Sequence, residues 1–144
     1  MDQVWGAVIL ILGLISWLGQ TVSRFAPEFA VRLGVSEAES DVETVFWADA
    51  RGEAAWDFLM GWTLPLAGFL LVIDSSAWPY VGLVGGAMYL YYGGRGSFTR
   101  LAMQRRGLRV GSPESLRLAY TFLPLWALAG LVTIIAAVIE LESR

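Results

Sequence analysis

The sequence contains no cysteine, no histidine and no lysine, and all ten of its basic residues are arginine. Without Cys and His, a zinc site of the usual kind, a haem ligand and a thiol nucleophile are excluded. Without Lys no Schiff base can form, which excludes a retinal protein. We therefore expect no cofactor, no metal ion and no catalytic residues, and we predict that the chain is not an enzyme.

Charge is scarce as well: 16% of the 144 residues are charged, whereas a soluble domain carries about 25%. At the same time 56% of the residues are hydrophobic and the mean hydropathy is +0.58. This combination is typical of a membrane protein, here a single domain covering residues 1–144. The net charge of −3 argues against a nucleic-acid partner.

Four apolar runs approach the length of about 20 residues that crosses a bilayer as a helix. They cover residues 4–22, 56–73, 77–94 and 118–139. The first run is interpreted as a retained span, because a signal peptide would have a basic start. The sequence thus predicts an all-α membrane protein, a four-transmembrane-helix bundle whose second and third spans form an antiparallel hairpin.

Two long loops, residues 23–55 and 95–117, join the spans on one side of the membrane and contain nine of the ten arginines. Arg144 is the remaining one. The positive-inside rule therefore places both loops in the cytoplasm and both termini outside. The composition and this asymmetry favour the plasma membrane of a prokaryote. The basic segment from Arg95 to Arg117 is expected to contact anionic lipid headgroups.

The loops are expected to hold short interfacial amphipathic helices on the cytoplasmic side. Pro27 suits the start of one helix and Gly34 its end, while Ser112 suits the N-cap of the fourth span. Ser36 and Glu39 have the spacing of a capping box. Residues 36–55 form either a separate helix or an extension of the second span, and the sequence leaves this open.

Small residues form a stripe along each span. In lipid, helices associate by close packing, so we interpret the stripes as contacts within the bundle, with a homo-oligomer face as the alternative. The predicted packing glycines are Gly13, Gly61, Gly68, Gly82, Gly86 and Gly130. Pro65 and Pro124 are predicted kinks that each free one backbone carbonyl. In some transporters such carbonyls bind substrate, which is the functional alternative.

Asp49, Glu53 and Asp57 recur every four residues and would share one face of a continuous helix. They belong to a predicted polar cluster at the cytoplasmic membrane boundary, the boundary cluster: Gln20, Arg24, Asp49, Glu53, Asp57, Arg95 and Arg117. Because a carboxylate near the hydrocarbon is costly unless paired, Asp57 is expected to pair with one of the arginines or with Gln20. The cluster is an ion-pair staple, a cation or proton site, or a docking surface.

The face beyond Asp57 continues with Gly61, Leu64 and Gly68, so no polar stripe crosses the whole bilayer. This favours a membrane protein that acts by association, as an accessory subunit, regulator or scaffold. Its partners would be lipids and either a second copy or another membrane protein. The alternative is a small oligomeric transporter or channel that uses Asp57 and the proline-kinked second and fourth spans.

Overall fold

The computed structural model describes residues 2–144, which are helical apart from turns, loops and one isolated β-bridge. In chain order the elements are α1 (Asp2–Phe25), α2 (Pro27–Arg32), the 3₁₀ helix η1 (Glu39–Asp41), α3 (Thr44–Met60), α4 (Thr63–Val72), α5 (Trp78–Arg105) and α6 (Pro113–Glu142).

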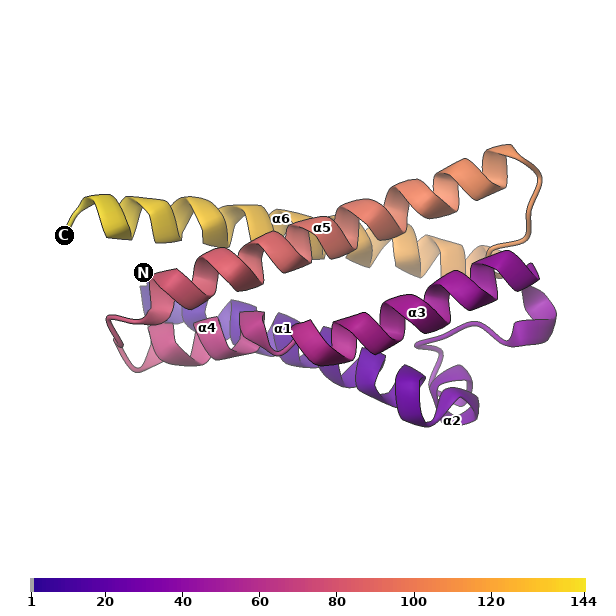
Figure 1. Ribbon diagram of the computed structural model, residues 1–144, viewed down its shortest axis with the longest axis horizontal. Helices are drawn as coiled ribbons and strands as arrows, with labels where there is room; N and C mark the ends of the chain where they lie inside the picture. Colours follow the sequence, from indigo (N-terminus) through magenta and orange to yellow (C-terminus); the bar gives the residue numbers. More distant parts are fainter. Residues whose placement is uncertain (1) are drawn as a thin grey trace.

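The long helices run along the length of the molecule (Figure 1). Both chain ends and the α4–α5 turn lie at one end, which we call the termini end. The connection through α2 and η1 and the α5–α6 loop lie at the other, the loop end. Helix α5 packs against α4 and α6, while α1 packs against α2, α3 and α4. The buried core between them is formed by Ile9, Leu64, Ala67 and Tyr89.

Within residues 2–144, three helical segments are long and apolar enough to cross a membrane: Gln3–Phe25, Thr44–Val72 and Pro113–Glu142. The predicted third span, now part of α5, is not among them, because glycine and tyrosine contribute little hydropathy. The outward faces of α1 and α6 are apolar, with Ile15 57% and Leu128 57% exposed. Such extensive apolar exposure is unusual for a soluble monomer and suits membrane association.

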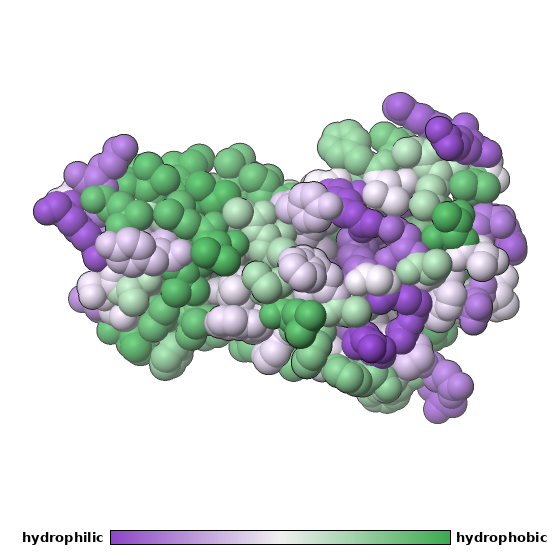
Figure 2. Space-filling model, viewed as in Figure 1, coloured by the Kyte–Doolittle hydropathy of each residue, from purple (hydrophilic) through white to green (hydrophobic). Residues whose placement is uncertain are grey.

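The hydropathy of the visible surface follows the same axis (Figure 2). Hydrophobic side chains cover most of the half nearer the termini end, and hydrophilic atoms form its tip. Towards the loop end, hydrophilic side chains gather between and beside α3 and α5. The visible face thus has an apolar belt between two polar regions.

The second predicted span begins earlier than expected and is interrupted. Residues 44–55 continue directly into it as α3, and Gly52 lies inside this helix. The interruption falls instead at Gly61 and Trp62, between α3 and α4. Pro65 explains this position, because a proline has no N–H to donate to the carbonyl four residues before it, here Gly61.

The predicted ends of the short helices are partly confirmed. Helix α2 begins at Pro27, and Gly34 follows it with a φ of 71°. The Ser112 side chain accepts a hydrogen bond from the Ser115 N–H at the start of α6. The predicted capping box of Ser36 and Glu39 is wrong, since η1 has no side-chain cap.

A small second hydrophobic core lies at the loop end. Val42 and Val110 form an antiparallel β-bridge, and the Glu43 N–H donates to the Arg109 carbonyl at 2.9 Å. The side chains of Val42, Phe46 and Val110 are buried together. The bridge holds the two long loops against each other.

Close helix contacts are made at glycines. A Cβ atom on Gly86 would lie 2.7 Å from the Gly130 carbonyl oxygen, and a Cβ on Gly130 would lie 2.5 Å from that of Gly86. A Cβ on Gly13 would lie 2.5 Å from Cδ of Pro65. These distances leave no room for a side chain, so α5 meets α6, and α1 meets α4, backbone to backbone.

The other predicted packing glycines differ in how tightly they are enclosed. A Cβ on Gly68 would lie 2.5 Å from the Leu10 nitrogen, and one on Gly61 would lie 3.1 Å from the Trp17 ring. Gly82 faces the Trp78 ring at 3.3 Å. The enclosed glycines that were not predicted include Gly85, which lies against Leu64, and Gly93, which lies against the Leu123 carbonyl.

We expect Gly86→Leu to destabilise the protein by about 1–3 kcal/mol or more, because overpacking would force α5 and α6 apart. Gly94→Leu is the matched control, since a Cβ at Gly94 meets nothing within 4 Å. Thermal unfolding in detergent should show a clear loss for the first variant and none for the second. Equal melting temperatures would contradict the contact.

Candidate functional site

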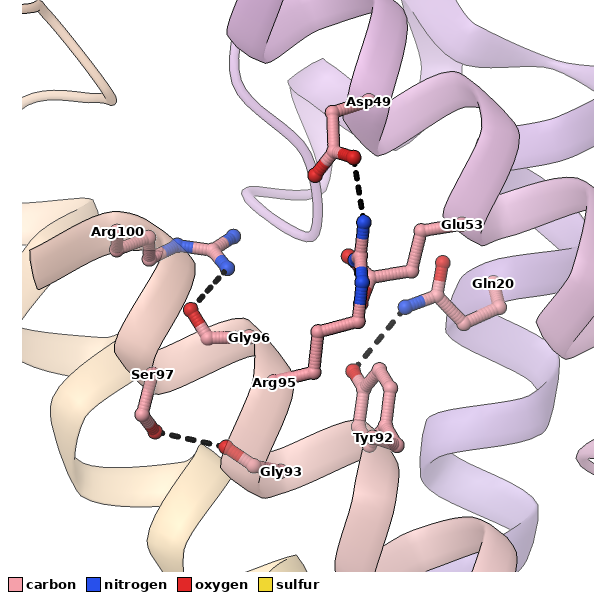
Figure 3. Close-up of polar contacts among 9 residues, drawn as sticks. All are labelled: Gln20, Asp49, Glu53, Tyr92, Gly93, Arg95, Gly96, Ser97 and Arg100. Atoms are coloured by element: carbon pink, nitrogen blue, oxygen red, sulfur yellow. Dashed lines mark hydrogen bonds and ion pairs between the residues drawn. The ribbon is translucent and has the colours of Figure 1, made fainter. Parts of the chain in front are cut away.

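The boundary cluster is centred on Arg95 of α5, which reaches across to α3 (Figure 3). Its Nη1 donates to Oε1 of Glu53 at 2.9 Å, and its Nη2 pairs with Oδ1 of Asp49. Asp49 and Glu53 are one helical turn apart, so one guanidinium bridges both carboxylates. The three side chains are 14–29% exposed. The pairs therefore join α3 to α5 at a partly buried place.

The charge of Arg95, one residue beyond the predicted third span, is secured by these partners. Burial by itself would lower the pKa of the guanidinium. The charges and hydrogen bonds of Glu53 and Asp49 outweigh burial and raise the pKa above its usual value. Arg95, Asp49 and Glu53 thus form an internally paired group within the cluster.

Gln20 of α1 lies beside this group and donates from Nε2 to the Tyr92 hydroxyl at 3.1 Å (Figure 3). The Tyr92 ring lies in edge contact with Tyr89 and Trp126, each at a centroid distance of 6.0 Å. The cluster therefore continues from charged groups between α3 and α5 into an aromatic layer between α1, α5 and α6.

The expected pairing of Asp57 is wrong. Its carboxylate is 5% exposed and forms no ion pair or hydrogen bond with any side chain among residues 2–144, and its Oδ2 is buried without a partner. Arg95 is occupied by Asp49 and Glu53, and Gln20 by Tyr92. Asp57 is therefore an isolated carboxylate inside the protein.

The other predicted members of the cluster lie elsewhere. Arg24 stacks on the Phe25 ring at 5.6 Å, and Arg117 forms no ion pair within the described chain. Arg51 donates to the backbone carbonyls of Ser23 and Arg24, which fastens the end of α1 to α3. The group of charged side chains that pair with one another is thus smaller than the predicted boundary cluster.

The α3–α4 break lies one turn beyond Asp57, and its carbonyl oxygens lie within hydrogen-bond reach of side-chain donors. Two are bound by indoles: Trp17 Nε1 donates to Phe58 O at 2.9 Å, and Trp62 Nε1 to Leu59 O at 2.8 Å. The Thr63 hydroxyl donates to Met60 O at 2.8 Å.

The fourth carbonyl, that of Gly61, is the one freed by Pro65. The Tyr89 hydroxyl lies 3.0 Å from it and 2.9 Å from the Gly13 carbonyl. The single O–H of this phenol thus lies between a carbonyl of α1 and one of the α3–α4 break, and it can donate to either of them. At Pro124, the second predicted kink, the helix is not interrupted: α6 continues through this residue as one helix.

Sequence reasoning did not identify Tyr89, Trp17 or Thr63 as partners of the break. A signal was present, since a proline inside a span predicts a freed carbonyl, and a buried tyrosine usually finds a hydrogen-bond partner. The contact between Arg100 of α5 and Glu37 was also not identified from the sequence. Nη2 of Arg100 lies 3.8 Å from Oε1 of Glu37. The loop that carries Glu37 is positioned by tertiary packing, which periodicity does not report.

No group of three or more Asp and Glu side chains within residues 2–144 is arranged to hold a metal ion. Asp49 and Glu53 direct their oxygens to Arg95 instead. Chemically, the arrangement can join helices, hold an isolated carboxylate next to a helix break, and present arginines at the loop end. Comparison with known protein families, with curated proteins and with solved structures gave no match to this chain.

We expect Asp57→Asn to melt at least as high as the wild type, since the change removes a buried carboxylate that has no partner. Glu53→Gln is the control: it weakens a charge-assisted bond to Arg95 and should cost about 1 kcal/mol. Thermal unfolding in detergent compares the two. A lower melting temperature for Asp57→Asn would reveal a partner of Asp57.

Proposed function

We propose that the chain is a four-span integral membrane protein in the plasma membrane of a prokaryote, with α1, α3–α4, α5 and α6 as its spans. The position of the termini supports an even number of crossings, because both lie at the same end (Figure 1). Three crossings would separate them. Helix α5 packs against both α4 and α6. If these two helices cross the membrane, α5 crosses it between them.

The orientation proposed is with the loop end in the cytoplasm and both termini outside. Nine of the ten arginines belong to the two loops or to the helix segments next to them, which favours the cytoplasmic side. Helix α2 suits an interfacial position there. Phe29 and Leu33 are 52% and 56% exposed, so they can enter the lipid while Arg32 meets the headgroups.

Single cysteines at Ser40, Ser75 and Ser112 test this topology in a chain that has no cysteine of its own. On intact cells, an impermeant thiol reagent should label the Ser75 variant alone. After the cells are opened, all three variants should react. Labelling of the Ser40 or Ser112 variant on intact cells would overturn the orientation.

We infer that the protein acts by association, as an accessory subunit, regulator or scaffold, and not as an enzyme. The observation that carries this is the internal pairing of Arg95 with Asp49 and Glu53. The most concentrated charge near the membrane boundary thus joins α3 to α5 instead of facing a substrate. Buried ion pairs of this kind suit a fixed arrangement of helices.

Exposed arginines at the loop end supply the surface for association. Arg105, Arg106 and Arg117 are exposed and form no ion pair within the described part of the chain. Each basic residue near an anionic membrane surface contributes about 1 kcal/mol. Anionic headgroups are therefore proposed as partners, together with a second copy or another membrane protein.

A small oligomeric transporter or channel is the second candidate, favoured by the unpartnered carboxylate of Asp57 beside the helix break. One observation weighs against it. The carbonyls of residues 58–60 at the break each accept a hydrogen bond from a side chain, and that of Gly61 lies within reach of the Tyr89 hydroxyl, so the break offers a substrate few free acceptors.

Flux measurements on purified protein in liposomes separate the two candidates. We expect no proton or cation flux above that of empty liposomes, and we expect crosslinking in native membranes to give complexes of defined mass. Flux that is lost in Asp57→Asn but kept in Asp74→Asn would establish the transporter. Asp74 is a suitable control because it lies exposed in the α4–α5 turn. Absence of both flux and complexes would contradict association.

A further inference from the structure

A cavity of about 310 Å³ lies between α1, α5 and α6 towards the loop end, and we call it the lateral cavity. Its two long walls are faces of α1 and α6, with residues at helical spacing. The apolar lining includes Leu12, Ile15, Gly19, Leu118, Phe122 and Trp126. Its size falls at the lower end of the range of about 300–1,000 Å³ found for small-molecule sites.

The cavity exists because α1 and α6 stay apart over this part of their length. Helix α1 packs on α3 and α4, whereas α6 packs on α5. The Trp126 indole donates to the Leu12 carbonyl at 3.1 Å and joins the two walls there. A Cβ on Gly19 would meet nothing within 4 Å, so the wall of α1 faces open space.

The rim of the cavity is apolar and accessible. Ile15, Leu118 and Phe122 line it and are 57%, 47% and 42% exposed. In a bilayer these side chains would border acyl chains rather than water. An acyl chain could enter from the side without crossing a polar barrier.

The lining towards the loop end is polar and contains one charged pair, Arg100 and Glu37. Arg100 lies six residues beyond the predicted third span, which is about 9 Å along a helix. The headgroup region extends about 5–8 Å beyond the hydrocarbon core on each side, so this distance reaches its outer edge. The cavity thus places an apolar section at the depth of acyl chains and a charged section at the depth of headgroups.

The guanidinium of Arg100 has unused donors. Its Nη1 donates to the Gly96 carbonyl at 3.3 Å (Figure 3), and its Nη2 lies 3.8 Å from Glu37, beyond hydrogen-bond length. Its Nε is buried without a partner. An arginine carries five N–H donors in a planar fork that fits the oxygens of a phosphate.

We propose that the lateral cavity binds one acyl chain of an anionic phospholipid, with the phosphate of its headgroup on Arg100. This rests on the proposed membrane setting and names the lipid partner more closely. Glu37 faces the same guanidinium and repels the phosphate. The Glu37 carboxylate therefore lowers the affinity of the cavity for the anionic lipid, and neutralising this carboxylate strengthens lipid binding.

Thermal unfolding of the full chain in a neutral detergent measures binding. The probes are lysophosphatidylglycerol, lysophosphatidylcholine with the same chain, and glycerol phosphate, which has the headgroup chemistry without a chain. The first should raise the melting temperature in a saturable way, since a ligand that binds the folded state stabilises it. Lysophosphatidylcholine should need an about tenfold higher concentration to give the same shift in melting temperature. The third should have no effect.

Four variants locate the site. Arg100→Gln should lose the preference for the anionic lipid, and Arg100→Lys should keep part of it. Glu37→Gln should bind it more tightly. Gly19→Leu should fill the cavity and abolish the shift, whereas Gly94→Leu, a glycine with equally open surroundings away from the cavity, should bind normally.

The following results would overturn the proposal. Equal shifts by both lysolipids would remove anion recognition, and an equal shift by glycerol phosphate would indicate a site for free phosphate esters. Unchanged binding in Gly19→Leu would place the lipid elsewhere. If Arg100→Gln does not fold, weaker binding in Glu37→Gln would overturn the proposal by itself. The assay is independent of topology, so failed binding and failed orientation can be distinguished.

Discussion

The arrangement of this protein depends on how the carbonyls at the α3–α4 break find hydrogen-bond donors. Pro65 cannot donate a hydrogen bond, so the buried Gly61 carbonyl needs another partner inside the protein. The Tyr89 hydroxyl supplies it from α5 and also lies within hydrogen-bond reach of the Gly13 carbonyl of α1. Because Gly13 lies directly against Pro65, the same small region fixes α1, α4 and α5 together. Indole and hydroxyl groups donate hydrogen bonds to the remaining carbonyls of the break.

The acidic groups of α3 that precede this break have different surroundings. Towards the loop end, Arg95 compensates Asp49 and Glu53, and this pairing joins α3 to α5. Asp57, one turn closer to the break, is buried and has no such partner. The first arrangement suits a rigid bundle that associates with other molecules, and the second is the reason to keep transport as the alternative.

The sequence predicted those features that depend on local pattern. Apolar length predicted the helical segments, Pro27 and Ser112 predicted helix starts, and the spacing of Asp49 and Glu53 placed both on one helix face. It could not predict the features that depend on tertiary packing. Arg95 has two carboxylates within reach and cannot also pair with Asp57. The Val42–Val110 bridge joins loops far apart in sequence, and the lateral cavity exists because α1 and α6 separate.

The melting temperature of Tyr89→Phe, measured in detergent against Tyr91→Phe, shows whether the Tyr89 hydroxyl stabilises the α3–α4 break. Tyr89 is buried against two carbonyls, whereas its neighbour Tyr91 is 61% exposed. Removal of the Tyr89 hydroxyl leaves the buried Gly61 carbonyl without a donor, which should cost about 1–3 kcal/mol. We expect a clearly lower melting temperature for Tyr89→Phe and an unchanged one for Tyr91→Phe. Equal melting temperatures for the two variants would contradict it.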